Sequence, residues 1–341
     1  MKFAIISADS CHKAGFKIDC MQGDCTSFLN WIDVFSGVHL SYDKLREESD
    51  ISYLKDFDVI MFSGNLHYIT DIIRIAEMLK SEDTITIYYP EGSTQLYDNS
   101  INGFHKEYYD AWNACDILSS AEEDKIDYYE SFVSSDTIVR FIHVPMREEL
   151  FIPDMFISKE KKERFTVVYG DNNPNHPLTA MACAYRMNMT ITPVCISHDH
   201  LKSIRAIMPG IDLSIGYPKL AQKYFFSLLG RSMIHFYPTE WIGTARQQVA
   251  CAIVGTPCIG NKDSHTQKRL FPKLGAYIYD LKAMIEIAKE LESNETFYRE
   301  TADYAHREAW FYSLKNTMTR FMSAVESAKK IKARRRGAVL V

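Results

Sequence analysis

The feature that most constrains the fold is a regular alternation of short apolar segments with amphipathic segments of helix length. The apolar segments of the first half are apolar on both faces, which is typical of parallel strands covered by helices on both sides. Their repeated alternation with helices predicts a doubly wound α/β domain. The expected strands lie at residues 3–7, 58–63, 84–89, 116–119 and 138–144, and the expected helices at 27–35, 68–80, 105–114 and 125–134.

The same alternation restarts after a charged stretch at residues 156–164, which we interpret as a linker. A length of 341 residues also exceeds the usual size of one domain. We therefore expect two tandem Rossmann-like domains, 1–155 and 156–320, followed by a basic helix or tail at 321–341. In the second domain we expect strands at 165–169, 191–197, 213–216, 233–237, 257–260 and 276–279, and helices at 177–187, 219–229, 244–254, 281–293 and from about 294 to 332.

The two halves carry opposite charge. Residues 1–155 contain 12 Lys and Arg against 28 Asp and Glu, a net charge of −16, whereas residues 156–341 contain 27 against 16, a net charge of +11. A basic half suits an anionic ligand such as a nucleotide diphosphate. An acidic half disfavours nucleic acid as a partner, because like charges repel. Simple attraction between two domains explains the asymmetry equally well.

The cysteines and the apolar runs exclude several classes of protein. None of the eight cysteines forms a Cys-x-x-Cys pair, and several lie in apolar runs where cysteine packs as a small hydrophobic residue. We expect neither a disulfide framework nor a metal site, and only Cys11, Cys20 and Cys25 with His12 merit a metal assay. The N-terminal apolar run is too short for a signal peptide, and no stretch reaches the roughly 18 apolar residues of a membrane-spanning helix. We expect a cytoplasmic protein without a transmembrane segment.

Residues 219–280 are the most informative segment. They predict a helix, a strand that ends in Tyr237-Pro238-Thr239-Glu240, a turn with Gly243, and a helix of small residues from Thr244. Glu240 thus falls at the carboxyl end of a parallel strand, where open α/β sheets bind ligands. The start of the following helix offers free N–H groups to an anion, and Arg246 could add a phosphate contact.

This segment resembles the nucleotide-binding half of a GT-B fold glycosyltransferase. The retaining branch of that family has a Glu, seven residues, a second Glu, a helix of small residues and Gly-Thr-Pro. Glu240 matches the first position, Gln248 replaces the second Glu, and Gly255 arrives about two residues late. Segments 115–120 and 138–144 also resemble the end of a GT-B acceptor domain. The resemblance implies two Rossmann-like domains facing across a cleft, with a C-terminal helix that crosses back onto the first domain.

The resemblance also implies roles for donor-binding residues in the second half. Glu240 corresponds to the acid that hydrogen-bonds the ribose of the sugar nucleotide, and a carboxylate suits two hydroxyl groups. The loop that contains Gly170, Asn172 and Asn173 lies where the family binds the diphosphate, although this loop has no Lys or Arg. Tyr217 follows a strand where the family contacts the base. The remaining candidates for the donor site are Gly243, Thr244, Arg246, Gln248 and Lys268, with Lys262 and Arg269 as further cations.

An inverting transfer needs a general base in the first half. Glu91 follows the strand expected at 84–89, and a carboxylate there could take the proton of the acceptor hydroxyl. Asp9 and His12, after the first strand, are rivals, as is His67. A retaining mechanism needs no such base, and the sequence leaves the choice open. The family usually needs no bound metal and no cofactor, because helix N-termini and basic side chains stabilise the leaving diphosphate.

The sequence predicts a transferase that moves a sugar from a nucleotide-diphosphate donor to a hydroxyl acceptor. One alternative is a viral-type glucosyltransferase that modifies hydroxymethylated DNA bases, which the acidic first half disfavours. A second is a catalytically degenerate binding protein or scaffold, suggested by Gln248 and by the missing cation in the Gly170 loop. A third is another enzyme on two Rossmann-like domains, although no Gly-x-Gly-x-x-Gly follows the first strand. The basic run at 329–336 indicates a solvated helix end rather than a nucleic-acid or membrane contact.

Overall fold

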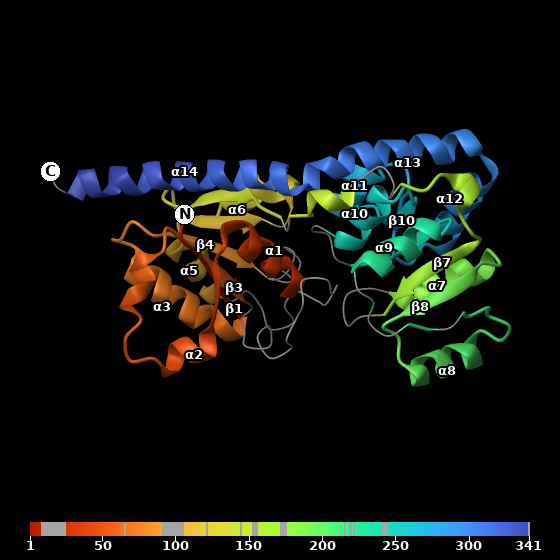
Figure 1. The fold of residues 1–341 in the computed structure, drawn as a ribbon, viewed down its shortest axis with the longest axis horizontal. Coiled ribbons are helices and arrows are strands. Elements are labelled where there is room, and N and C mark those ends of the chain that lie inside the picture. The colour runs from red at the N-terminus through yellow and green to blue at the C-terminus, as the bar shows by residue number, and fades with distance from the viewer. Residues whose placement is uncertain are drawn as a thin grey trace. The chain divides into compact units, whose positions relative to one another are not determined.

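The chain forms two compact units in the computed structural model (Figure 1). Unit 1 takes residues 1–18, 23–146 and 314–341, and unit 2 takes residues 19–22 and 147–313. The structure describes residues 1–7, 25–64, 66–90, 106–120, 122–143, 145–151, 156–170, 176–214, 216–217, 220, 222–240 and 245–339. Unit 1 therefore includes the last helix of the chain.

Unit 1 is built on a parallel sheet with the strand order β2-β1-β3-β4-β5-β6. The expected apolar segments form five of these strands, and β2 is an edge strand that the sequence did not predict. Its residues are partly exposed and include a histidine, so it lacks the continuous apolar character of the others. The strands are β1 Phe3–Ser7, β2 Val38–Ser41, β3 Val59–Gly64, β4 Ile85–Pro90, β5 Ile117–Ser120 and β6 Ile138–Phe141.

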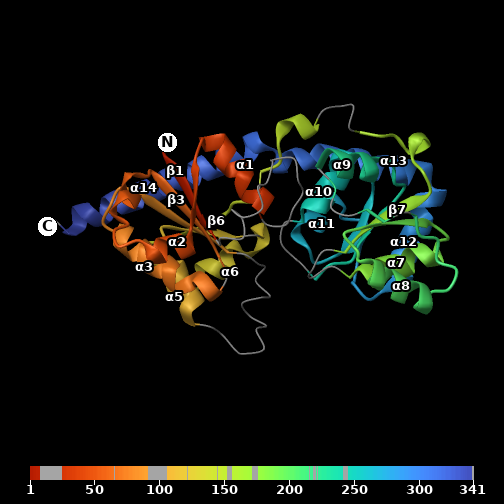
Figure 2. The same ribbon diagram turned by 60° about the horizontal axis from the view of Figure 1, so that its bottom comes forward.

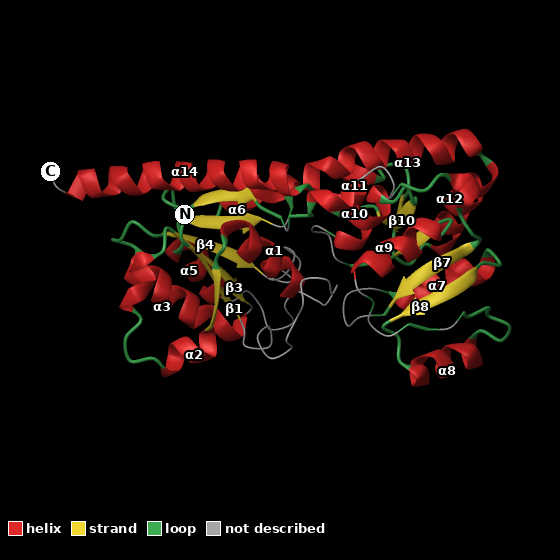
Figure 3. Cartoon of the chain, viewed as in Figure 1, coloured by secondary structure: helices red, strands yellow, loops and turns green. Residues whose placement is uncertain are grey.

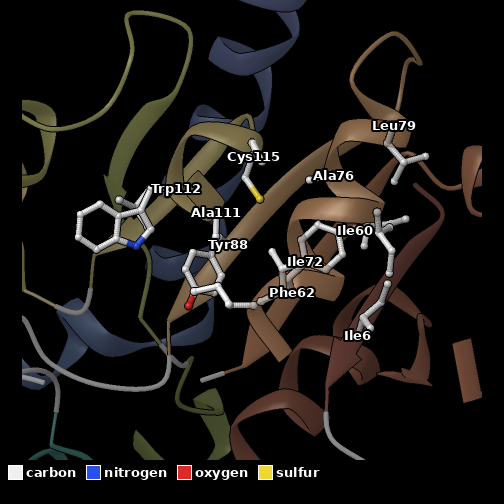
Figure 4. Packing of buried hydrophobic residues seen from close by; sticks show 14 of the residues in the cluster. Ile6, Ile60, Phe62, Ile72, Ala76, Leu79, Tyr88, Ala111, Trp112 and Cys115 are labelled. Carbon is white, nitrogen blue, oxygen red and sulfur yellow. The ribbon is translucent and has the colours of Figure 1, made fainter. Parts of the chain in front are cut away.

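Helices cover both faces of this sheet, as a doubly wound domain requires. One face packs against α2 (Tyr42–Glu47), α3 (Ile69–Leu79), α5 (Lys106–Ala114) and α6 (Ile126–Glu130). The other packs against α1 (Cys25–Phe35) and α14 (Leu314–Val339). Figure 2 shows α3 and α5 on the opposite side of the sheet from α14. Figure 4 shows the first core, where Phe62 and Tyr88 of the sheet meet Ile72 of α3 and Trp112 of α5.

Helix α14 belongs to the core of unit 1. Its residues Phe321 and Val325 are fully buried, and the Phe321 ring lies 4.9 Å from the Trp31 ring of α1. Near its other end, Lys332 is 4% exposed and lies 3.1 Å from the Asp116 carboxylate beside β5. The basic run is therefore not only a solvated helix end, because Lys332 lies inside the unit. Arg335 also pairs with Asp136, and Arg336 with Asp83.

Unit 2 is also built from parallel strands and helices, with its strands in a two-stranded and a three-stranded group. Its strands are β7 Phe165–Tyr169, β8 Thr190–Val194, β9 His235–Tyr237, β10 Cys258–Asn261 and β11 Gly275–Ala276. Its helices are α7 Pro177–Arg186, α8 His198–Ile207, α9 Gln222–Arg231, α10 Arg246–Ile253, α11 His265–Leu270, α12 Leu281–Ser293 and α13 Glu295–Ala309. Short 3-10 helices complete the chain at Ser52–Asp56, Leu66–Tyr68, Glu123–Lys125, Glu148–Phe151, Lys159–Lys161 and Trp310–Tyr312.

The strands of unit 2 all pair in parallel. Figure 3 shows β7 and β8 side by side. Strand β9 pairs with β10, and β10 with β11. The two groups of strands join where the Met233 amide donates to the Phe165 carbonyl at 3.2 Å. Beyond β8, the expected strand at 213–216 is reduced to isolated bridges at Leu213 and Tyr217.

The long helix expected from about 294 to 332 is two helices. A 3-10 turn at Trp310–Tyr312 and an extended Ser313, with φ −62° and ψ 155°, separate α13 from α14. The amide of Leu314 then donates to the Met146 carbonyl at 2.7 Å. The break falls where the chain passes from unit 2 back to unit 1.

Candidate functional site

The chain reverses its direction of strand addition in unit 2 between β7 and β9. Strand β8 lies on one side of β7, and β9 and β10 follow on the other side. In open α/β sheets, ligands bind at the carboxyl ends of the strands at such a switch point, because the loops there leave in opposite directions. Tyr169 ends β7 and Tyr237 ends β9, so the residues after them form the candidate site.

Three side chains from different strand ends meet there, and we call them the edge cluster: His176, Glu240 and Tyr279. The Tyr279 hydroxyl donates to Glu240 Oε1 at 3.2 Å. His176 Nε2 lies 3.2 Å from the same oxygen, and the His176 and Tyr279 rings pack edge to face at 5.3 Å. His176 is itself fixed, because its amide donates to the Pro238 carbonyl at 2.9 Å. Tyr279 thus holds one carboxylate oxygen by a hydrogen bond, and His176 Nε2 lies close to the same oxygen without hydrogen-bond geometry.

The edge cluster is open to solvent. The exposed fraction is 25% for the His176 side chain, 53% for the Glu240 side chain and 66% for Tyr279. Desolvation, followed by the hydrogen bond to Glu240, raises the pKa of Tyr279 above its ordinary value. Tyr279 therefore stays protonated and donates to Glu240 at neutral pH. Both of these contacts fall on Oε1, so Oε2 faces no partner among the three cluster residues.

A second aromatic residue and a lysine extend this edge of unit 2. Lys262 follows β10, and its Nζ lies 3.9 Å from the centre of the Tyr277 ring, which is a cation–π distance. The Tyr277 side chain raises the pKa of Lys262, so the lysine remains a cation. The Lys262 amide donates to the Ala276 carbonyl at 3.0 Å and fixes the backbone. The edge therefore offers a positive charge as well as a carboxylate.

Gly170 and Tyr217, both expected to bind the donor, lie at the same edge of the sheet with contacts of their own. The Gly170 amide donates to the Val194 carbonyl at 2.9 Å and is used within the sheet. A Cβ at Gly170 would lie 2.2 Å from Cγ1 of Ile196, so packing alone requires a glycine there. Tyr217 is 40% exposed and pairs with Val194, with β8 and β7 between it and β9. It does not belong to the edge cluster.

Gln248 has a structural role in the described residues. It is fully buried, its Nε2 donates to Gln267 Oε1 at 2.6 Å, and Ser264 Oγ lies 3.4 Å from its Oε1. Gly260 leaves room for this amide pair, since a Cβ there would lie 2.6 Å from Gln267 Oε1. The position of the second Glu in the retaining motif is thus occupied by an amide that ties α10 to α11.

The two cations expected near the donor lie on neighbouring helices. Arg246 is half-buried at the first residue of α10, and its charge acts on the Tyr237 hydroxyl. Lys268 is exposed on α11. The other expected site residues lie outside the described residues: Asp9, His12, Glu91, Asn172, Asn173, Gly243 and Thr244. Of these, Asp9 follows β1, which ends at Ser7, and Glu91 follows β4, which ends at Pro90.

Sequence reasoning missed His176 and Tyr279 as site residues. Each follows a parallel strand of unit 2, as Glu240 does, and that shared position was the available signal. His176 directly precedes the proline that begins α7, and Tyr279 lies just after β11. We had expected residues 276–279 to be a strand, which hid Tyr279 inside an element.

Comparisons with known proteins find similarity in structure and not in sequence. No family model matches the chain, and no curated protein matches it. Sucrose-phosphate synthase from Thermosynechococcus elongatus superposes with a TM-score of 0.72 at 9% identity, covering 99% of this chain and 100% of that chain. HepE from Anabaena, in complex with UDP-glucose, gives a TM-score of 0.65 at 10% identity over 97% and 100% of the chains.

A third similar structure is an α-glucosyltransferase in complex with UDP-glucose and DNA containing an abasic site. It gives a TM-score of 0.59 at 10% identity over 96% of this chain and 99% of that chain. The chain has the GT-B fold. The α/β class and the GT-B architecture expected from the sequence are confirmed. Among the described helices, none combines the length and the apolar character that crossing a membrane requires.

Proposed function

We propose that the protein is a glycosyltransferase that moves a sugar from a nucleotide-diphosphate-sugar donor to a hydroxyl acceptor. The observation that carries this proposal is the edge cluster, which presents a carboxylate at the switch point of unit 2. Two proteins of the same fold are bound to UDP-glucose in their structures. At identities near 10%, a shared fold does not by itself specify a function. The residues of the edge cluster are the more specific support for this proposal.

In this proposal Glu240 binds the ribose of the donor. Tyr279 donates to Oε1 and His176 lies beside the same oxygen, which leaves Oε2 for the ribose hydroxyls. Tyr279 contributes an exposed ring beside the sugar. Lys262 and Arg246 are the cations for the diphosphate, together with the N-terminus of α10.

The acceptor side of the proposal rests on unit 1. Glu91, Asp9 and His12 follow strands of its sheet in the sequence, and one of them takes the acceptor proton if the transfer inverts the anomeric centre. The transfer itself needs no bound metal in this proposal, since cationic side chains and backbone N–H groups stabilise the leaving diphosphate.

The test is nucleotide binding by the full chain and its variants. We expect UDP, GDP, ADP or another nucleoside diphosphate to raise the melting temperature, by an amount that corresponds to about 2.7 kcal/mol at 100 times the dissociation constant. Glu240→Ala should weaken this binding at least about tenfold, because hydrogen bonds to a charged group contribute roughly 1.5–3 kcal/mol. Tyr279→Phe should weaken it less, since it only frees Oε1.

Glu300→Ala is the matched control, because Glu300 is an exposed glutamate of unit 2 on α13. It should bind the nucleotide as the wild type does. Binding that is unchanged in Glu240→Ala would remove Glu240 from the donor site. If no nucleotide stabilises the protein, the scaffold interpretation replaces the enzyme.

DNA is the acceptor to test second, since one protein of this fold is bound to DNA. Unit 1 is assembled largely from the acidic half of the sequence, which disfavours that acceptor. We expect no retention of duplex DNA by the protein at low salt. Retention that falls steeply with added salt would favour a DNA-modifying enzyme.

A further inference from the structure

Two thiols and an imidazole converge inside unit 2, away from the edge cluster. His235 begins β9, Cys258 begins β10, and Cys251 lies on α10. Their ligand atoms all lie within 4.8 Å of one another, and all three residues are buried. Because His235 and Cys258 begin their strands, they lie at the opposite end of the sheet from Glu240.

The fold itself brings these three side chains together. His235 and Cys258 are paired residues on adjacent parallel strands, so their side chains project from the same face of the sheet. Helix α10 packs against β10 and places Cys251 over this face. No sequence motif indicated this grouping, because the residues are spread over 24 positions without a metal-binding spacing.

His235 is not satisfied by its surroundings. It is 1% exposed, and neither of its ring nitrogens reaches hydrogen-bond geometry with any described residue. The Gln247 side chain and the Val167 backbone are the hydrogen-bonding groups beside this ring, and Gln247 Oε1 is also buried without a hydrogen bond of full geometry among the described residues. Buried polar groups nearly always have partners, so these atoms indicate a missing one.

The ligand types of the group suit a soft divalent metal ion. Thiolate sulfur and imidazole nitrogen are the ligands that Zn²⁺ takes in closed structural sites. Two thiolates would neutralise a doubly charged ion, which removes the cost of burying an isolated charge.

We propose that His235, Cys251 and Cys258 bind a structural zinc ion. Binding replaces two S–H bonds by two Zn–S bonds, and the two protons leave to solvent. The imidazole supplies a third ligand, and Gln247 Oε1, beside His235, is the candidate for the fourth. The ion ties α10 to β9 and β10 beneath the donor edge. The proposal does not depend on the glycosyltransferase assignment.

The experiment uses the full chain, purified, stripped with a chelator under reducing conditions and reloaded with Zn²⁺ or Co²⁺. We expect one zinc ion per chain by elemental analysis after dialysis. Co²⁺ should give the near-ultraviolet charge-transfer band of thiolate ligation. Cys258→Ser and Cys251→Ser should each lose both signals. Cys183→Ser is the matched control, because Cys183 is a fully buried free cysteine of the same unit on α7, and it should keep both.

The wild-type cobalt spectrum keeps the proposal falsifiable if the serine variants do not fold. A wild-type protein without stoichiometric zinc and without the thiolate band overturns the proposal. So does a Cys258→Ser variant that folds, by circular dichroism, and retains the zinc, since the ion then lies elsewhere. A Cys251–Cys258 disulfide in the protein as purified, found by peptide mass mapping, overturns it as well.

Discussion

At the scale of single residues, Lys162 is the most unusual group in unit 2. It is 9% exposed, and its Nζ donates to the Gly230 carbonyl at 2.7 Å and to Thr256 Oγ1 at 2.8 Å. Gly230 lies in the last turn of α9. Val254 is the C-cap residue of α10, and its carbonyl lies 3.5 Å from Lys162 Nζ. Lys162 therefore supplies a donor to the ends of two helices, where carbonyl groups otherwise lack partners.

The same burial makes stability depend on pH. Desolvation lowers the pKa of Lys162 to about 7, whereas the unfolded chain keeps the ordinary value of 10.5. Below pH 7 both states are protonated, and the cost of burying the ammonium is fully present. Between pH 7 and 10.5 the folded protein loses the proton first, so the free energy of unfolding should rise with pH, by about 2 kcal/mol from pH 7 to pH 9.

Lys162→Met should remove this rise. The measurement is urea unfolding of the wild type and the variant at several pH values, where the difference between the two curves isolates Lys162 from other titrating groups. A difference that does not change with pH would show that Lys162 stays charged in the folded protein.

At the scale of elements, the contact between α14 and β5 depends on a buried ion pair. Asp116 accepts from the Thr86 amide and hydroxyl, both at 3.0 Å, and from Lys332 Nζ at 3.1 Å. Lys332 also donates to the Thr84 carbonyl at 2.6 Å. Burial lowers the pKa of Lys332, and Asp116 opposes that shift. Each charge is tolerated only because the other is present.

Removing both partners should therefore cost less stability than the sum of removing each one alone. We expect Lys332→Met to destabilise the protein by up to about 3–5 kcal/mol, because buried Asp116 then keeps only Arg335, 3.8 Å away, as a cationic partner. The double variant Lys332→Met with Asp116→Asn should lose less stability than the sum of the losses of the two single variants. Lys329→Met is the control, since Lys329 pairs with Glu326 on the surface and should contribute under about 1 kcal/mol. Additive costs in chemical denaturation would contradict the coupling.

The sequence predicted most helices and strands but only part of the candidate site. The physical reason is that helices and strands show as local patterns, whereas the site depends on which strands are neighbours. A strand such as β3 is visible as a local apolar run, and α12 begins and ends where expected. The edge strand β2 and the helix α11 are too short to carry a long periodic pattern, and α8 was missed although it has an apolar face. Glu240 was proposed as a candidate because it lies shortly after the end of its own strand, β9. Its contacts with His176 and Tyr279 depend on which strands are neighbours, and no local pattern contains the strand order.

At the scale of the whole molecule, unit 1 is discontinuous along the chain. Its second core combines Phe3 and Ile5 of β1 with Phe321 and Val325 of α14. These residues are separated by all of unit 2. Without α14, only α1 would cover this face of the sheet, and the buried carboxylate of Asp116 would lose Lys332 and Arg335.

A chain that ends at residue 313 should therefore lose the folded state of unit 1. We expect it to aggregate or to bind a hydrophobic dye, and to lose its near-ultraviolet circular dichroism in part. Unit 2 should survive, so one cooperative transition should remain in a thermal scan. Adding a synthetic peptide of residues 314–339 in trans should restore part of the signal. A truncated protein with two normal transitions would contradict the role of α14.

The position of α14 also sets an order of events on the ribosome. Unit 2 draws nearly all of its residues from one contiguous segment, 147–313, so it can fold as soon as that segment has emerged. Unit 1 is synthesised first, yet it cannot close its core until residues 314–339 have left the exit tunnel. The half of the protein that is made first therefore finishes folding last, and its uncovered sheet must wait through the synthesis of the other half.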